Sequence, residues 1–216
     1  MIDVNKQVKR ITYNGKELPL VGSEPTVLAN ATFTSNGTYR PTNGVNGFAS
    51  VTVNVDTKEA AIIGIIERDN NAPPFAVPEG TKRIGEDAFS GVQSIITLPD
   101  SITEIAYQAF WNANGFRSTT LPASLKTIGK SAFSACYGIR SIEIPASVET
   151  IGDYAFSGCE NLLEVTFKGK PTSFGSQVFA NTHKYITIRV PWSAGEVSGF
   201  PGYKPENATI IYNYTE

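Results

Sequence analysis

The chain contains few of the residues that carry catalytic or metal chemistry. It has two cysteines and one histidine among 216 residues. Two cysteines do not make a disulfide framework, and His183 is the histidine that any Ser-His-Asp or Cys-His arrangement would have to use. No companion motif such as Gly-x-Ser-x-Gly accompanies it. We therefore expect no enzyme, no metal site and no cofactor, and we interpret His183 as a surface loop residue.

Long apolar runs and basic runs are missing as well. The N-terminal stretch MIDVNKQVKRITYNGKELPL lacks the uninterrupted apolar segment of a signal peptide, and no stretch is long enough to span a bilayer. The formal net charge is −2, from 18 basic and 20 acidic residues. Without a basic run there is no footprint of nucleic-acid binding. We expect a protein that is made in a cytoplasm, inserts into no membrane and binds no nucleic acid.

The chain does have a clear internal repeat. Three sets of residues recur in register at a nearly constant interval, which indicates stacked repeats of one structural unit. The phenylalanines are Phe89, Phe110, Phe133, Phe156 and Phe179. The prolines are Pro78, Pro99, Pro122 and Pro145, with Pro191 two intervals further on. The third set is Ile84, Ile105, Ile128, Ile151 and Phe174.

Each repeat predicts a short strand, an extended piece and a helical turn. In SIEIP, apolar Ile142 and Ile144 alternate with polar Ser141 and Glu143, which is typical of a strand with one buried face. Pro145 ends this strand because proline has no amide hydrogen to donate. SVETIG then predicts a second extended piece, and DYAFSGC a short helical turn whose phenylalanine points inward.

A unit of this size cannot cover its own apolar face, so consecutive units have to stack. The phenylalanines then form one continuous core. Cys136 and Cys159 occupy equivalent positions in neighbouring repeats. This places them within reach of a disulfide, but we interpret them as two buried thiols.

The stretch IPASVETIGDYAFSGCENLLEVTF closely resembles the BspA-type leucine-rich repeat. The resemblance as a whole covers roughly residues 62 to 190. The resemblance implies a leucine-rich-repeat solenoid of about five coils, mainly β with short helical turns. It implies little about function, because this repeat serves adhesins, surface antigens and virion proteins alike.

Residues 1–58 do not follow the repeat and predict a small all-β module. Asn14-Gly15 and Asn36-Gly37 each predict a tight turn between two strands, because both positions of an Asn-Gly pair tolerate positive φ. The alternation in FASVTVNV predicts a further half-buried strand.

Both ends of the chain resemble segments of phage proteins. TFTSNGTYRPTNGVNGFASVTVNV is similar to a short module of structural and tail-associated proteins of phages and prophages of Gram-positive bacteria. VPWSAGEVSGFPGYKPENATIIYNY is similar to the closing segment of phage repeat proteins of the same group. We expect residues 191–216 to form a cap, with Trp192 and the strand ATIIYNY covering the open end of the solenoid.

Two aromatic residues depart from the repeat and predict a contact surface. Trp111 stands where other repeats carry serine or alanine, and Tyr107 stands three residues before a core phenylalanine at a position that is mostly charged or polar. Both are predicted to be exposed, at i and i+4 on one face of the helical turn. Tyr137 is predicted to extend this patch. Local packing and the binding of another chain or a glycan both stay open.

The outward face of the strands is a second candidate surface. Two residues before each proline position stand Thr97, Thr120, Glu143, Thr166 and Arg189, with Ser118, Ser141 and Glu164 in a parallel row. Solenoids often bind partners along such a sheet. This face has no aromatic side chains, so a solvated face is the default interpretation, with Thr120, Glu143 and Arg189 as candidate partner-binding residues.

Our leading hypothesis is a non-enzymatic structural protein of a phage virion, in the tail, the baseplate or on the head surface. Residues 1–58 would dock to other virion proteins, residues 59–190 would project as the solenoid, and residues 191–216 would cap it, in several copies or as a homo-oligomer. The solenoid would bind a host surface protein or glycan, or a neighbouring virion protein.

A bacterial surface adhesin is the alternative. A polysaccharide-degrading spike is a third hypothesis, because the separation of a carboxylate pair is set in space.

Overall fold

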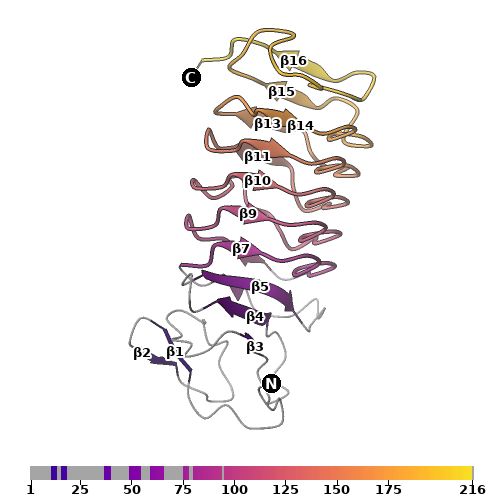
Figure 1. Cartoon of the computed structure of the whole chain (residues 1–216). Coiled ribbons are helices and arrows are strands. Elements are labelled where there is room, and N and C mark those ends of the chain that lie inside the picture. Colours follow the sequence, from indigo (N-terminus) through magenta and orange to yellow (C-terminus); the bar gives the residue numbers. More distant parts are fainter. Residues whose placement is uncertain are drawn as a thin grey trace.

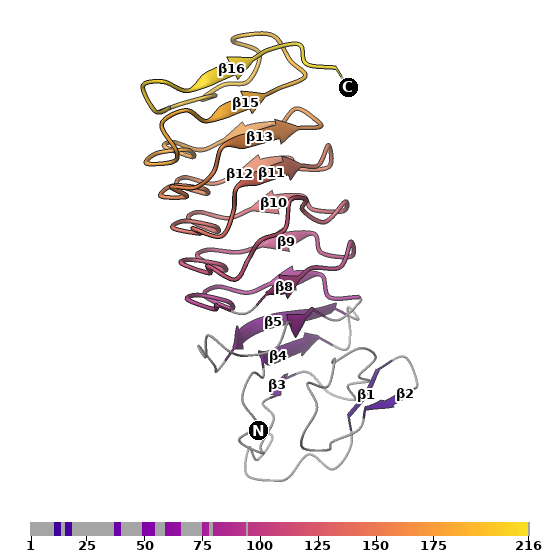
Figure 2. The same cartoon turned by 180° about the vertical axis from the view of Figure 1, so that it is seen from behind.

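The computed structural model is a solenoid of stacked coils that climbs from the N-terminal to the C-terminal end (Figures 1 and 2). The described residues are 11–13, 16–18, 37–39, 49–54, 59–65, 75–77, 80–93 and 95–215, with side chains described from residue 77 onward. Within these ranges every regular element is a strand, and none is a helix that could cross a membrane. The predicted class, a mainly β leucine-rich-repeat solenoid, is confirmed.

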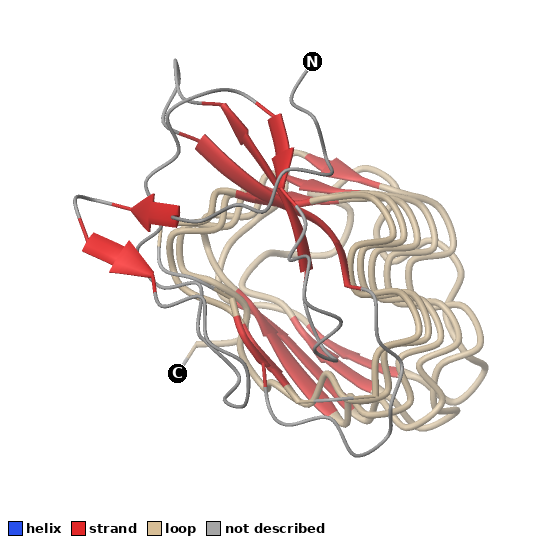
Figure 3. Cartoon of the chain, turned by 90° about the horizontal axis from the view of Figure 1, so that it is seen from below, coloured by secondary structure: helices blue, strands red, loops and turns tan. Residues whose placement is uncertain are grey.

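The strands lie on two opposite sides of the coil, joined by turns, as the view along the solenoid axis shows (Figure 3). One side is an eight-stranded sheet in the order β14-β12-β10-β9-β7-β5-β4-β3. Its strands are β3 (Gly37–Tyr39), β4 (Ala49–Asn54), β5 (Glu59–Ile65), β7 (Arg83–Ile84), β9 (Glu104–Ile105), β10 (Thr127–Ile128), β12 (Thr150–Ile151) and β14 (Ser173–Phe174). From β5 to β14 neighbouring strands are parallel.

The other side of the coil carries two smaller parallel sheets. They are β6 (Phe75–Ala76) with β8 (Ile96–Thr97), and β11 (Ser141–Ile144), β13 (Glu164–Phe167), β15 (Thr187–Arg189) and β16 (Thr209–Ile211) in that order. The strand predicted in SIEIP is β11. Ile142 and Ile144 are buried while Ser141 and Glu143 are half-buried, so the period of two does separate a core face from an outer face.

The core is a column of phenylalanine rings. Phe89, Phe110, Phe133, Phe156 and Phe179 are fully buried, with ring centroids 5.0 to 5.9 Å apart and planes 3° to 16° from parallel. The isoleucine ladder forms a second wall, since Ile84, Ile105, Ile128 and Ile151 are buried and paired in register across β7, β9, β10 and β12. Each coil therefore covers the apolar face of the next, as the repeat predicts.

The predicted helical turn is wrong, because the turn has residues with left-handed backbone on both sides of each phenylalanine. Two residues before the phenylalanine, Asp87, Gln108, Ser131, Tyr154 and Gln177 have φ between 50° and 57°, and two residues after it the backbone is left-handed again, as at Ala135 (φ 58°). Alternate N–H groups then point along the solenoid axis instead of back along a helix. Phe110 N–H, for example, donates to Ala132 O at 2.8 Å, one coil further on.

Glycine follows the isoleucine ladder where successive coils approach most closely. A Cβ on Gly152 would lie 2.5 Å from Lys130 N, and one on Gly175 would lie 2.4 Å from Asp153 N. No side chain fits at these two positions without moving the neighbouring coil.

The two cysteines are free thiols inside the core. Cys136 Sγ donates to Phe110 O at 2.9 Å and Cys159 Sγ donates to Phe133 O at 3.0 Å, so each thiol bonds to the preceding coil. Burial raises the pKa of the Cys136 thiol well above its usual value, and the neighbouring Cys159 adds to this. Burial also raises the pKa of Cys159 to about 12. Both sulfurs stay protonated and serve as core residues, as predicted.

The strands of the N-terminal region continue the larger sheet of the solenoid. β5 pairs parallel with β7, and β4 and β3 add antiparallel strands at the end. β1 (Ile11–Tyr13) and β2 (Lys16–Leu18) form the hairpin predicted around Asn14-Gly15. The turn predicted at Asn36-Gly37 is wrong, because Gly37 lies within β3 and pairs with Val53 of β4. The side chains of Phe48, Val51, Val53 and Val55 lie outside the described residues, and the domain boundary at residue 58 stays a prediction.

The C-terminal segment closes the other end of the solenoid. β16 pairs parallel with β15, and Trp192 is buried against Phe167 and Phe200, with ring centroids 5.2 and 5.3 Å away. Gly199 lies against the carbonyl of Phe174 in β14. The cap therefore covers both sheets at this end.

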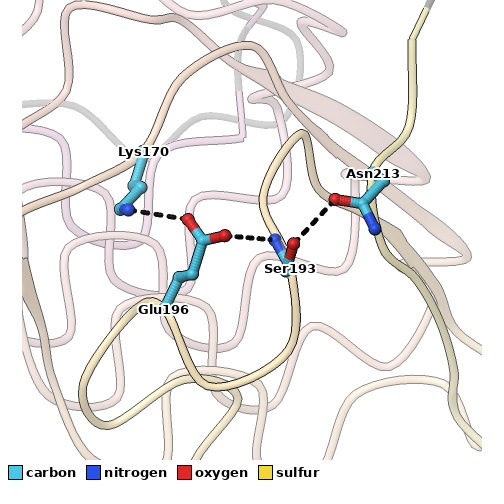
Figure 4. Close-up of polar contacts among 4 residues, drawn as sticks. All are labelled: Lys170, Ser193, Glu196 and Asn213. Atoms are coloured by element: carbon cyan, nitrogen blue, oxygen red, sulfur yellow. Dashed lines mark hydrogen bonds and ion pairs between the residues drawn. The ribbon is translucent and has the colours of Figure 1, made fainter.

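A polar network joins the cap to the coil below it (Figure 4). Lys170 Nζ lies 2.8 Å from Glu196 Oε2, and Ser193 N–H donates to Glu196 Oε1 at 3.2 Å. Ser193 Oγ donates to Asn213 Oδ1 at 3.0 Å. The hydrogen bonds from Lys170 and Ser193 lower the pKa of Glu196. The network fixes the loop around Glu196 in place.

Replacing Phe133 with alanine should lower the free energy of unfolding by about 3–5 kcal/mol, because it removes one ring from the middle of the column. Urea denaturation followed by circular dichroism measures the loss. Trp111→Ser is the control, since this exposed aromatic should cost about 0.5 kcal/mol or less. Equal losses in the two variants would contradict the phenylalanine core.

The two thiols should resist a disulfide reagent such as DTNB in the folded protein at pH 8. Their raised pKa leaves almost no thiolate, which is the reacting form, and the core excludes the reagent. The absorbance should show two reacting thiols per chain in denaturant. Rapid labelling of the native protein would contradict their burial.

Candidate functional site

Tyr107 and Trp111 lie on the turn of one coil and are both exposed, by 41% and 43%. Between them Ala109 and Phe110 are fully buried. The turn therefore directs the two aromatic residues outward while it anchors their backbone in the core. The predicted exposure is confirmed, but the helical face proposed to explain it does not exist.

Small neighbours leave the Trp111 side chain uncovered. Gly91 N–H donates to Trp111 O at 2.7 Å, and Asn112 N–H donates to Ser134 O at 2.8 Å, so the adjacent coils hold Ser90 and Ser134 at the position of Trp111. A serine side chain is too short to cover an indole ring. Trp111 is therefore a large apolar side chain standing between two small polar ones.

Tyr107 has long charged neighbours instead. Asp87 N–H donates to Tyr107 O and Gln108 N–H donates to Lys130 O, both at 3.1 Å, which places Glu86 and Lys130 at the equivalent positions of the adjacent coils. The surface around the two aromatic residues thus combines rings, hydroxyls and charges of both signs.

Tyr137, on the next coil, is exposed by 40%. Its N–H donates to Asn114 Oδ1 at 2.9 Å, and its carbonyl accepts from Asn161 Nδ2 at 2.9 Å. Two asparagines from neighbouring coils therefore hold its backbone. The ring is exposed as predicted, and its membership of one binding patch with Tyr107 and Trp111 stays a prediction.

The candidates on the strand face mostly contact other residues of the chain. Glu143 Oε1 lies 3.5 Å from Lys168 Nζ, and Arg189 Nη1 lies 3.4 Å from Glu164 Oε2. The Arg189 guanidinium also lies 5.8 Å from the centre of the Tyr214 ring. Thr120 is exposed and joins Glu143 through an isolated parallel bridge. These charges stabilise the stack of coils, so their role in partner binding remains only a prediction.

No catalytic arrangement forms within the described residues. His183 is half-buried, and its Nδ1 accepts from Tyr185 N–H at 3.3 Å. No group of three or more His, Cys, Asp or Glu side chains in the described part of the chain could hold a metal ion. Five glutamates of the described residues pair with lysine or arginine, as Glu149 does with Lys126 at 2.7 Å.

The sequence analysis missed several exposed apolar residues, Leu163, Tyr185 and Tyr203 among them, and an arginine pair. Leu163, Tyr185 and Tyr203 are exposed by 42%, 57% and 54%. Arg117 and Arg140 are both exposed and occupy equivalent positions in neighbouring coils. The signal was present, because the arginines are separated by the same interval as Phe110 and Phe133. Leu163 continues the same row one full interval beyond Arg140.

A solved structure of a bacterial leucine-rich-repeat protein shares this fold, and two others are similar over part of the chain. The chain superimposes on a leucine rich cell surface protein of Faecalibacterium prausnitzii with a TM-score of 0.54 and 23% identity, covering 82% of this chain and 51% of that one. The T. pallidum leucine rich repeat protein gives a TM-score of 0.44 and 21% identity, over 62% and 86% of the two chains. A leucine-rich repeat protein of Bacteroides ovatus gives 0.40 and 17%, over 78% and 66%.

The chain thus spans about half the length of the F. prausnitzii protein. No curated protein sequence matches it. The sequence profile of the BspA type leucine rich repeat region matches residues 68–195 in six copies, in agreement with the coils described above. The chain therefore belongs to the BspA-type leucine-rich-repeat family.

Proposed function

We propose that the chain is a non-enzymatic binding scaffold whose solenoid presents an exposed surface to a partner. The observation that carries the proposal is Trp111. Its position holds serine or alanine in the other coils, its side chain is 43% exposed, and the core beneath it is complete without it. Folding gains little from an exposed indole, whereas tryptophan and tyrosine are favoured anchors of protein interfaces.

We further propose that the scaffold belongs to a phage virion. Support comes from the two terminal segments, which resemble segments of phage structural proteins on both sides of the repeats. In this arrangement the N-terminal strands, which lie at one end of the solenoid, attach to the particle. The capped end then points outward, toward a host surface molecule or a neighbouring virion protein.

A bacterial cell-surface adhesin is the second candidate function. It is supported by the name of the F. prausnitzii protein, a leucine rich cell surface protein with the same fold. Both candidates require the same exposed solenoid and differ in the structure that carries it.

Localisation separates the two candidates. An antibody against residues 80–215 should label intact phage particles induced from a culture that carries the gene, in negative-stain electron microscopy. Mass spectrometry of gradient-purified particles should give the copy number. Detection only in the cell envelope of uninduced bacteria would contradict the virion proposal and support the adhesin.

Replacing both Tyr107 and Trp111 with serine should weaken partner binding at least about tenfold, because buried aromatic anchors supply much of an interface's affinity. Binding of the purified chain to particles or envelopes, according to its location, measures the effect. Tyr203→Ser is the matched control, since Tyr203 is an exposed aromatic of the cap. Circular dichroism should show all variants folded. Unchanged binding by the double variant would remove this surface from the proposal.

A further inference from the structure

Arg117 and Arg140 form an exposed pair of like charges in adjacent coils. Backbone contacts on both sides of the pair fix its register. On one side the backbone of Gly138 lies against the carbonyls of Asn114 and Phe116. On the other side Thr120 bridges to Glu143. The two arginines therefore stand one coil apart, about 4.8 Å along the axis.

This pair departs from the way the solenoid otherwise arranges its charges. The ion pairs of the described residues join opposite charges on neighbouring segments of the stack, as Arg83 does with Glu104 at 2.9 Å. Arg117 and Arg140 have no carboxylate partner among the described residues. Two like charges held one coil apart repel each other. Folding thus does not explain the pair, whereas two adjacent guanidinium groups suit a carboxylate from outside.

The row continues with exposed apolar side chains. Leu163, exposed by 42%, stands one coil beyond Arg140, and its N–H donates to Arg140 O at 2.8 Å. Tyr185, exposed by 57%, lies on the following coil, one position short of the full repeat interval after Leu163. We name Arg117, Arg140, Leu163 and Tyr185 the corner row.

Other charged groups border the corner row. Lys184 Nζ lies 4.9 Å from the centre of the Tyr185 ring and adds a third cation. Two acidic residues also stand near the row: Glu164 directly follows Leu163 and pairs with Arg189 at 3.4 Å, and Glu160 precedes Leu163 by three residues. The two arginines thus stand at one end of the row and the two apolar side chains, with Lys184 beside the tyrosine ring, at the other, on a chain whose net charge is −2.

We propose that the corner row binds an extended peptide segment of a partner protein that carries an acidic residue followed by apolar residues. The proposal rests on the proposed function and names the class of partner. A carboxylate would accept hydrogen bonds from Arg117 and Arg140. The apolar side chains that follow would cover Leu163 and Tyr185. The aliphatic Leu163 side chain favours an apolar peptide side chain over a hydroxylated sugar.

The spacing of the row fits an extended peptide. Successive coils are about 4.8 Å apart along the solenoid axis. Measured along this axis from Arg117, the midpoint of the arginine pair lies at about 2.4 Å, Leu163 at about 9.6 Å and Tyr185 at about 14.4 Å. Alternate side chains of an extended peptide are about 6.7 Å apart, so a carboxylate at the midpoint places the next two same-face residues at about 9.1 and 15.8 Å. The motif expected is therefore acidic-x-apolar-x-apolar, read in either chain direction.

A random 12-residue peptide display library, selected on residues 1–216, tests this inference. We expect enrichment of Asp or Glu two residues from an apolar residue. A peptide from this pool should bind the Arg117→Gln/Arg140→Gln variant at least about tenfold more weakly, because the variant loses two charge-assisted contacts. The Arg83→Gln/Lys126→Gln variant, with the same charge change on the opposite sheet, should bind as the wild type does. Polygalacturonate, an anionic glycan, should not compete.

Three results would overturn the inference: enriched peptides without acidic residues, equal binding by the Arg117→Gln/Arg140→Gln variant, or full competition by polygalacturonate. The last would identify an anionic glycan as the occupant. Peptides whose binding depends on Tyr107 and Trp111 but not on the arginines would overturn the corner row and leave the proposed function intact. Recovery of no peptide, together with unchanged partner binding by the aromatic double variant, would count against both.

Discussion

The contact between one coil and the next is the interaction on which the whole structure depends. No coil encloses a core of its own, because each phenylalanine ring has its neighbours in the coils before and after it. The backbone follows the same rule. At the turns of Phe89, Phe110, Phe133 and Phe156, three N–H groups donate to the following coil, as those of Ser131, Phe133 and Ala135 do to Asp153, Ala155 and Ser157.

This dependence determines which positions can carry function. Inward positions, such as those of Phe133 and Cys136, are fixed by the neighbouring coils above and below. Outward positions are restricted only where an ion pair or a backbone contact crosses between coils. Trp111 and the corner row occupy outward positions. Their residue types can therefore change without loss of the stack. In such a solenoid, the residues that stabilise the fold are different from the residues that can contact a partner.

Much of the fold could be predicted from the sequence, because the ladders repeat by residue type. Phenylalanine, isoleucine and proline recur in register, and the burial of the phenylalanines and isoleucines follows from that. The left-handed turn positions could not be predicted, since residues as different as Asp87, Ser131 and Tyr154 occupy them. Their conformation comes from hydrogen bonds between coils and not from local preference. The prediction for Gly37 was wrong for a related reason. An Asn-Gly pair is a local turn signal, whereas the pairing of Gly37 with Val53 depends on β4, which is distant in the sequence.

The candidate site could be predicted only in part. Exposure of Tyr107, Trp111 and Tyr137 followed from comparing repeats, since each departs from polar neighbours at its position. The ion pairs of Glu143 and Arg189 could not be foreseen, because they depend on which side chains reach across adjacent strands. The arginine pair is visible in the sequence only once unpaired charges are compared between coils.

The direction of the turn hydrogen bonds makes the two ends of the stack chemically different. For the first four phenylalanines of the column, the N–H groups of the phenylalanine itself and of the residues two before and two after it donate toward the C-terminal end. The carbonyls that accept these bonds face the N-terminal end, as Tyr107 O does toward Asp87 N–H. On the strand side some N–H groups point the other way, as that of Ala106 does toward Ile84 O in the preceding coil. In the last turn the equivalent residues are Gln177, Phe179 and Asn181, and a Cβ on Gly202 of the cap would lie 3.6 Å from Gln177 N. Along the turns, one end of this solenoid thus offers N–H donors and the other offers carbonyl acceptors, so the two ends cannot be closed by the same kind of cap.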